Sequence, residues 1–148
     1  MRAEIEQARP LDAGVVGRIL SDTTDTADWL PRLYSRAEEL MYAAQMIEAG
    51  WVSVVRVNGQ IVGFLARRDA EIHGLFLQPD AQGQGLGRML LTAAMTAETR
   101  LGLWVYQANV RAQSFYTSMR FTEVARTEGS GNDAQLPDIR YEWRERVA

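Results

Sequence analysis

The stretch IHGLFLQPDAQGQGLG occupies residues 72–87 and sets the expected fold of the chain around it. The apolar run Ile72–Leu77 predicts a strand, and a helical pattern begins at Leu86. Three glycines lie within Gly83–Gly87, where they let the backbone take positive φ values and approach a ligand closely. The first turn of the following helix points unpaired N–H groups into the same space. This arrangement predicts a cradle for an anion, specifically the phosphates of a cofactor.

The composition is that of one globular domain spanning residues 1–148. Hydrophobic residues make up 47% of the chain and charged residues 24%, which is typical of globular proteins. The chain has no cysteine, which excludes disulfides, thiolate metal sites and a cysteine nucleophile. A thioester on the protein is excluded with them, and direct transfer between bound ligands remains open.

The charges argue against nucleic acid and membrane partners. The net charge is −3, and lysine is absent, so all 16 cations are arginines spread along the chain without a basic block. Residues 1–6 carry charges where a secretory signal would be apolar, and no apolar run approaches the ~18 residues of a membrane span. We therefore expect a cytoplasmic protein.

Periodicity and turn residues predict an α/β or α+β chain with a mixed sheet. Strands are expected at Ala3–Arg9, Val52–Val57, Ile61–Arg68, Ile72–Leu77, Leu103–Tyr106, Phe121–Arg126 and Ile139–Arg144. Helices are expected from Asp12 to near Ser21, from Ser35 to Ala49, from Leu86 to Leu101 and from Val110 to Met119. The polar stretch Asp22–Pro31 and the glycine-rich stretch Gly129–Asn132 are expected to be loops.

Several details of these elements can be stated. Asn58-Gly59 is a strong hairpin signal, because both central residues of a type I′ turn need positive φ. Strand Ile72–Leu77 is continuously apolar, which favours a central position with both faces buried. Gly102 is expected to end the helix before it. The apolar face of the second helix is expected to comprise Leu40, Met41, Ala44 and Ile47.

Spacing separates the possible glycine-rich phosphate loops. A dinucleotide fold requires G-x-G-x-x-G, which would need glycine where Arg88 stands. A P-loop requires a lysine, and the chain has none. A glycine turn that merely opens a helix is the remaining interpretation without a ligand.

The stretch matches Q/R-x-x-G-x-G/A at Gln82, Gly85 and Gly87, and so resembles the acetyl-CoA signature of the GNAT superfamily of N-acetyltransferases. The resemblance implies a single domain with the GNAT fold. This fold is a mixed, mostly antiparallel twisted sheet of six to seven strands, flanked by about four helices. The sheet is splayed between strands 4 and 5, where the cofactor inserts.

The resemblance continues downstream through Asn109, the aromatic pair Phe115-Tyr116, and Phe121. The family usually has glycine where Arg120 stands, so a turn with positive φ would cost about 1 kcal/mol here. The implied activity moves an acetyl group from acetyl-CoA to a primary amine of a small molecule or peptide, by direct attack and without a metal. A backbone N–H of the central strand would stabilise the oxyanion. A non-catalytic acyl-CoA-binding or regulatory module and a nucleotide-dependent oxidoreductase stay open as alternatives.

The resemblance also implies the residues of the acetyl-CoA site. Arg88 and Arg111 stand near helix starts, where the helix dipole does not favour a cation, so an anionic ligand would explain their positions. Arg88 would hold the pyrophosphate of the cofactor and Arg111 its 3′-phosphate. Asn109 is also a natural N-cap of the helix that starts at Val110. The expected cofactor-binding residues are Phe76, Leu77, Gln82, Gly83, Gln84, Gly85, Leu86, Gly87, Arg88, Asn109, Arg111 and Tyr116.

The expected catalytic residues are Tyr116, Glu71 and His73. Tyr116 is the candidate general acid, because a phenol of pKa about 10 can protonate a thiolate whose conjugate acid is near 8.5. A helical face shared with Phe115 allows a purely structural role instead. Glu71 and His73 alternate onto one face of the central strand and are the candidate bases, with Glu71 preferred. A core histidine and a solvated carboxylate are the alternatives.

Trp29, Tyr34 and Trp143 are the expected acceptor-binding residues. The acidic stretch around Asp25 would favour a cationic amine, although such residues are commonly helix caps. The sequence leaves open which amine is used, whether acyl donors other than acetyl-CoA serve, and whether two copies form a homodimer.

Overall fold

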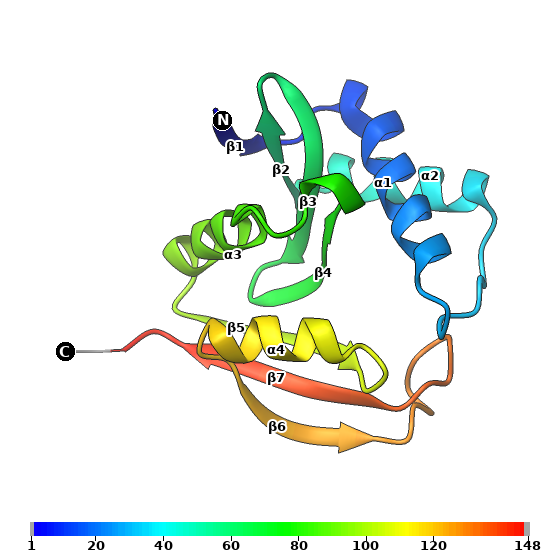
Figure 1. Ribbon diagram of the computed structural model, residues 1–148, viewed down its shortest axis with the longest axis vertical. Helices are drawn as coiled ribbons and strands as arrows, with labels where there is room; N and C mark the ends of the chain where they lie inside the picture. Colours follow the sequence, from blue (N-terminus) through cyan, green and yellow to red (C-terminus); the bar gives the residue numbers. More distant parts are fainter. Residues whose placement is uncertain (1, 147–148) are drawn as a thin grey trace.

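Seven strands form one sheet in the computed structural model, which describes residues 2–146 (Figure 1). The strands are β1 (Ala3–Gln7), β2 (Val52–Val57), β3 (Gln60–Arg68), β4 (Glu71–Leu77), β5 (Arg100–Tyr106), β6 (Thr122–Thr127) and β7 (Asp138–Arg144). The helices are α1 (Ala13–Thr26), α2 (Arg36–Glu48), α3 (Leu86–Ala97) and α4 (Val110–Ser118), with short 3-10 turns η1 (Pro10–Asp12) and η2 (Pro79–Ala81). The predicted α+β class is confirmed.

The sheet order is β1-β2-β3-β4-β5-β7-β6, which makes β4 the central strand, as predicted. The expectation that both faces of this strand are buried is wrong, because only Ile72 is fully buried and His73 is exposed. Neighbouring strands are antiparallel except β4 and β5. Among the described residues, β4 and β5 pair at one position only, Glu71 with Gly102. Beyond that pair the two strands diverge, and the predicted splay is present (Figure 1).

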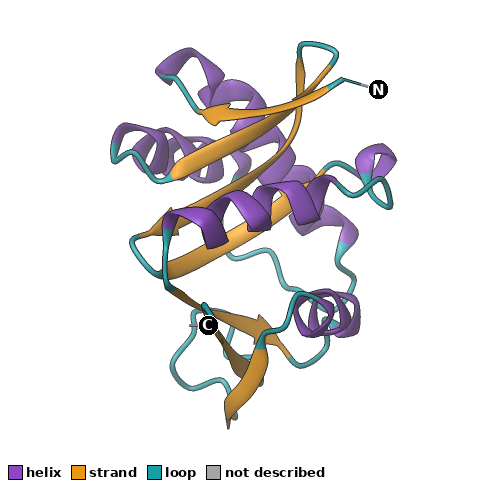
Figure 2. Cartoon of the chain, turned by 90° about the vertical axis from the view of Figure 1, so that its left-hand side faces the viewer, coloured by secondary structure: helices purple, strands orange, loops and turns teal. Residues whose placement is uncertain are grey.

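Two hydrophobic clusters hold the sheet and its helices together, and helices lie on both faces of the sheet (Figure 2). One cluster joins α1 and α2 to β2 and β3 through residues such as Ile19, Met46 and Phe64. The other joins α3 to β5 and β7 through residues such as Leu90 and Leu103. Burial of these fully covered side chains stabilises the fold by roughly 1.5–3 kcal/mol each.

The β2–β3 hairpin forms at the predicted turn. Asn58 has φ 51° and Gly59 has φ 86°, so both central residues take the left-handed conformation that a type I′ turn needs. Arg120 likewise has φ 69°, so the turn before β6 keeps the left-handed conformation without glycine.

Helix α1 is longer than predicted and continues past Ser21 to Thr26. The polar residues were expected to break it, yet the hydroxyls of Thr23 and Thr24 both donate to the Leu20 carbonyl at 2.9 Å. These bonds absorb side-chain donors that would otherwise compete with helical backbone bonds. The expected loop is therefore shorter, residues 27–35.

Helix α2 has the predicted bounds but a different buried face. Ile47 is buried as expected, whereas Leu40 and Met41 are 44% and 63% exposed. The buried row runs instead through Glu39, Ala43, Met46 and Ile47. Counting apolar residues alone missed this orientation, because a charged residue belongs to the buried row.

Helix α3 ends at Ala97, so the predicted extension to Leu101 is wrong. Leu101 lies in β5, where it is buried on the same face as Leu103 and Val105 at every second position. Gly102 does not end a helix. Its N–H donates to the Ala70 carbonyl at 2.9 Å, within the β4–β5 junction.

A β-bulge interrupts the pairing of β4 with β3. Gly74 pairs with Ala66 and Ile72 pairs with Arg67, so His73 is the extra residue. The bulge breaks strict alternation, because Ile72 packs into the same cluster as Leu75 and Leu77. Simple alternation therefore does not hold from Ile72 to Leu75, and the placement of Glu71 and His73 on one face stays a prediction.

The loop between β6 and β7 depends on Gly129. Its φ is 96°, and a Cβ there would lie 2.4 Å from the Leu136 carbonyl. We expect Gly129→Ala to lower the free energy of unfolding by about 2 kcal/mol or more in urea denaturation. Gly131→Ala is the control, because no heavy atom lies within 4 Å of its Cβ position. Equal stability of the two variants would contradict this account of the loop.

Candidate active site

The divergence of β4 from β5 is accompanied by a cleft of about 480 Å³ between β4, the start of α3 and α4. It contains the glycine-rich turn and the face of α4 that carries Tyr116. Its lining residues are Leu75, Leu77, Gln82, Gly83, Gly85, Leu86, Gly87, Arg88, Asn109, Arg111, Ala112, Phe115 and Tyr116.

The glycine turn leaves open space at the N-terminus of α3. Gly83 and Gly85 have φ values of 80° and 81°, and Gly85 is the N-cap residue of the helix. A Cβ at either position would have no heavy atom within 4 Å. The N–H groups of the first helical turn therefore face unobstructed space, which suits the phosphates of a ligand.

Gln82 connects the three elements around the cleft. Its Nε2 donates to the Leu77 carbonyl of β4 at 3.3 Å, and its Oε1 accepts from Nη1 of Arg111 on α4 at 2.6 Å. Arg111 is exposed, so its guanidinium keeps further donors for a ligand. Gln82 thus connects β4 to α4 across the cleft and orients the Arg111 guanidinium beside it.

Two other lining residues have contacts of their own. Nη1 of Arg88 lies 3.0 Å from Sδ of Met119. Oδ1 of Asn109 accepts the N–H of Ala112 at 3.1 Å, so Asn109 caps α4 as predicted.

The edge of β4 that faces β5 carries unpaired backbone donors. Gln78 N–H donates to the Val62 carbonyl of β3 at 2.9 Å. Successive residues of a strand direct their backbone groups to opposite sides, so the N–H groups of Leu77 and Leu75 point toward β5. Within the described residues β5 pairs with β4 only at Glu71, so the N–H groups of Leu75 and Leu77 are available to a ligand in the cleft.

Tyr116 is buried, yet it lines the cleft. Its ring makes edge contacts with Phe115 and Phe121 at centroid distances of 5.1 and 5.5 Å. Burial raises the pKa of its phenol, so the hydroxyl stays protonated at neutral pH. Every fully buried side-chain polar atom in residues 2–146 has a hydrogen-bond partner. The Tyr116 hydroxyl has no such partner among these residues, so it is not fully buried and is exposed to the cleft.

Phe76 and Gln84 are the two predicted cofactor residues that do not line the cleft. Phe76 points to the other face of β4, where its ring lies 5.0 Å from that of Phe64. Gln84 Nε2 donates to the Asp80 carbonyl at 3.1 Å. Three residues that line the cleft were not predicted: Leu75, Ala112 and Phe115. Leu75 is two residues before Leu77, so strand alternation was the signal that could have found it.

Glu71 and His73, the candidate bases, lie outside the cleft lining and have different partners. Glu71 accepts a hydrogen bond from Nη1 of Arg140 at 2.7 Å, at the position where β4–β5 pairing ends. The Arg140 guanidinium lies 5.6 Å from the centroid of Trp104. The exposed His73 ring is stacked on Trp51 at 5.0 Å.

The predicted acceptor residues separate into two groups. The ring centroids of Trp29 and Tyr106 of β5 are 5.5 Å apart. The Tyr34 hydroxyl donates to the Asp133 carboxylate in the β6–β7 loop. Trp143 instead belongs to the hydrophobic core and is 7% exposed. The structure brings Trp29 and Tyr34 to one side of the molecule and keeps Trp143 apart from them.

Two further features are absent from residues 2–146. No group of three His, Asp or Glu residues within residues 2–146 is arranged to hold a metal ion. None of the helices in this range is both long and apolar enough to cross a membrane.

Comparisons with known proteins give one consistent family. Residues 48–123 match the family model for an acetyltransferase (GNAT) domain. Peptidyl-lysine N-acetyltransferase YjaB of Salmonella typhimurium is 34% identical over 104 residues, which cover 70% of this chain and 71% of that protein. The solution structure of apo-form YjaB from Escherichia coli matches with a TM-score of 0.82 at 24% identity, covering 99% of this chain and 100% of that one. YncA of Salmonella typhimurium, solved with its cofactor acetyl-CoA, matches with a TM-score of 0.77 at 20% identity, covering 100% and 98%.

The glycine turn can be tested with CoA as a probe that carries phosphates. We expect Gly85→Ala to weaken CoA binding about tenfold or more in calorimetry, because the Cβ would enter the space in front of α3. Gly59→Ala is the control, because its φ of 86° and open surroundings give the same backbone strain away from the cleft. Equal CoA affinity of the two variants would show that the turn does not face the ligand.

Proposed function

The chain belongs to the GNAT family of acetyltransferases, and from that membership we propose that it moves the acetyl group of acetyl-CoA directly to a primary amine. The acceptor amine belongs to a peptide or a small molecule. The observation that carries the proposal is the cleft, which combines an open helix N-terminus, an unpaired edge of β4 and a protonated phenol.

The cleft residues have chemistry that suits acetyl-CoA. When bound, acetyl-CoA supplies a thioester, which is an activated acetyl group with a thiolate as leaving group. The glycine turn and the first turn of α3 would hold its diphosphate, with Arg88 and Arg111 as cations at the same cleft. The N–H groups of Leu75 and Leu77 would donate to the carbonyl oxygen as negative charge develops on it.

Tyr116 is the proposed general acid. Its raised pKa keeps the proton on the phenol, where it is available to the sulfur as the thiolate leaves, and the same shift makes the phenol a weaker acid than an exposed tyrosine. The aromatic contacts with Phe115 and Phe121 fix the ring, so the hydroxyl is held in one position.

Glu71 remains the proposed general base. It belongs to the single β4–β5 pair of the described residues, and its carboxylate would take the proton of the incoming ammonium directly or through water. The hydrogen bond from Arg140 keeps the carboxylate oriented. His73 is the second candidate, and its exposed ring is stacked on Trp51.

A lysine side chain in a peptide is the first acceptor to test, because the similar YjaB protein is named a peptidyl-lysine N-acetyltransferase. The present chain contains no lysine, so acetyl groups found on lysine in an assay would belong to the substrate. A cytoplasmic location remains the expectation from the sequence.

Acetyl-CoA is expected to raise the thermal unfolding temperature, since it would bind the folded state alone. At a concentration of about 100 times its Kd the stabilisation is about 2.7 kcal/mol. Thiol release should then appear with at least one amine from a panel of lysine peptides, peptide N-termini and polyamines. The proposal fails if millimolar acetyl-CoA leaves the unfolding temperature unchanged. Binding without thiol release from any amine would favour a non-catalytic acyl-CoA-binding module.

Tyr116→Phe should lower kcat by about 100-fold while acetyl-CoA affinity changes little, because only the proton donor is removed. Steady-state kinetics and calorimetry measure the two quantities. Tyr42→Phe is the control, because Tyr42 lies on α2 with its side chain exposed. Unchanged kcat in Tyr116→Phe would assign that ring a structural role only.

A further inference from the structure

The loop of residues 27–35 joins the two halves of the molecule. It begins at the C-cap of α1 and ends at Ser35, the N-cap of α2. Trp29 meets Tyr106 of β5, and Tyr34 bonds Asp133 of the β6–β7 loop. Figure 1 shows the α1–α2 connection running down to the β6–β7 connection. This loop therefore brings one predicted acceptor residue, Trp29, to β5 and another, Tyr34, to the β6–β7 loop.

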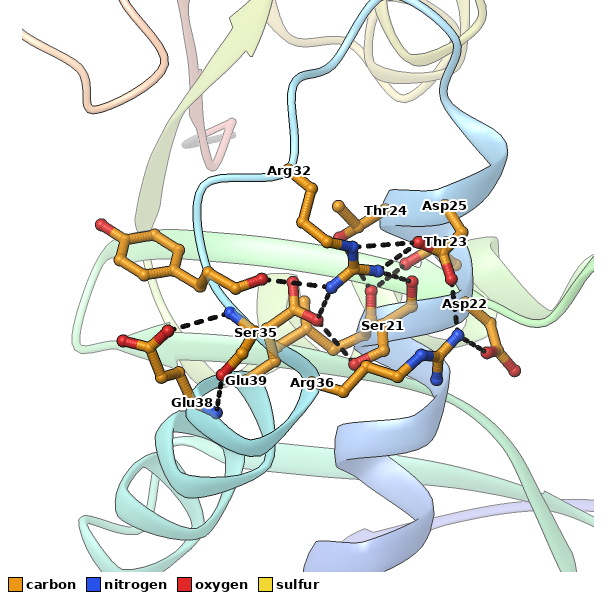
Figure 3. Close-up of polar contacts among 12 residues, drawn as sticks. Ser21, Asp22, Thr23, Thr24, Asp25, Arg32, Ser35, Arg36, Glu38 and Glu39 are labelled. Carbon is orange, nitrogen blue, oxygen red and sulfur yellow. Dashed lines mark hydrogen bonds and ion pairs between the residues drawn. The ribbon is translucent and has the colours of Figure 1, made fainter.

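Arg32 bonds to both helices that flank this loop (Figure 3). Its Nη2 donates to the Ser21 carbonyl of α1 at 3.1 Å, and its Nη1 donates to Oε1 of Glu39 on α2 at 2.5 Å. Nη1 also lies 3.2 Å from the Tyr34 carbonyl, and Nε donates to Oδ1 of Asp25 at 3.1 Å. One guanidinium thus connects α1, α2 and the loop itself.

Glu39 makes this contact specific. It is 7% exposed and also accepts the Ser21 hydroxyl at 2.7 Å, so its charge is held inside the α1–α2 interface. A buried carboxylate needs a cation with good geometry, and the planar fork of arginine supplies several donors at once. The orientation of α2, with Glu39 in its buried row, and the path of the loop are therefore coupled through Arg32.

Arg36 offers a natural comparison within the same cluster. It bonds Asp22 at 3.1 Å and Asp25 at 2.5 Å, and its side chain is 56% exposed. Within the described part of the chain, Arg36 makes no side-chain hydrogen bond to Glu39 or to the loop backbone. Exposed pairs of this kind contribute little to stability.

We propose that Arg32 is a positioning residue for the amine acceptor. By joining Glu39 to the Tyr34 carbonyl, it fixes the loop so that Trp29 and Tyr34 stand against β5 and the β6–β7 loop. The aromatic rings and the carboxylate of Asp133 suit a cationic amine. This inference rests on the proposed function and assigns the loop to the acceptor alone, since Arg32 does not line the donor cleft.

Steady-state kinetics with Nα-acetyl-lysine amide as acceptor test the proposal. We expect Arg32→Gln to raise the KM for the amine about tenfold or more, with a smaller effect on kcat and with the Kd for acetyl-CoA unchanged. Arg36→Gln should leave all three values within about threefold of wild type. An unchanged amine KM in folded Arg32→Gln overturns the proposal, as does an equal loss of acetyl-CoA affinity.

A second variant separates positioning from stability. Arg32→Gln leaves Glu39 buried without its cation, which can unfold the chain, whereas the double variant Arg32→Gln/Glu39→Gln removes both charges. We expect the double variant to recover the unfolding temperature while the amine KM stays raised, because the guanidinium contacts to both helices and the loop remain absent. Recovery of the amine KM together with stability would overturn the proposal.

Hydrogen exchange gives a readout that does not depend on turnover. If wild type releases no thiol with any amine, the proposed function fails, and exchange at residues 27–35 then decides the role of Arg32. Faster exchange in the double variant than in wild type and Arg36→Gln supports positioning of the loop. Equal exchange in all three proteins overturns it.

Discussion

β4 and β5 are paired at a single position among the described residues, and the donor cleft follows from this break in the sheet. A strand edge without a partner exposes backbone N–H groups that need a hydrogen-bond acceptor. Here the edge faces a cleft whose far wall is α4, so a ligand can complete the bonding that β5 does not supply. The break lies in the middle of the sheet, which brings strand, helix N-terminus and phenol to one cavity.

The rest of the fold keeps the two halves in place around this break. Helices α1 and α2 pack on β2 and β3, while α3 packs on both β4 and the β5–β7 half through one continuous cluster. Gln82 ties β4 to α4 at one end of the cleft, and the 27–35 loop ties α1 and α2 to β5 elsewhere. The contacts at the cleft and those of the loop come from different elements, so a substitution can disturb one set without the other.

Local chemistry was enough to predict the features that depend on neighbouring residues. The Asn58-Gly59 hairpin and the Asn109 cap are examples, because the conformation each residue needs is set within a few positions. The position of β4 in the centre of the sheet also followed from its apolar run. The glycine turn opens α3 at Leu86, as its spacing indicated.

Features that depend on distant partners were missed. Helix α1 continues past Ser21, where the local hydroxyl bonds of its threonines are joined by a bond from Arg32, eleven positions along the chain, to the Ser21 carbonyl. The face of α2 was misassigned because Glu39 is buried by a partner outside its own helix. The bulge at His73 follows from the pairing of β4 with β3. Phe76 was predicted to bind the cofactor together with Leu77, although neighbouring residues of a strand point to opposite faces.

Amide hydrogen exchange along β4, measured by NMR with and without CoA, tests the central claim most directly. Without CoA, the amides of Leu75 and Leu77 should exchange faster than that of Gln78, which is bonded to Val62. With CoA, exchange at Leu75 and Leu77 should slow while Gln78 changes little. Equal protection of the three amides without CoA, or no slowing when it is added, would contradict the account.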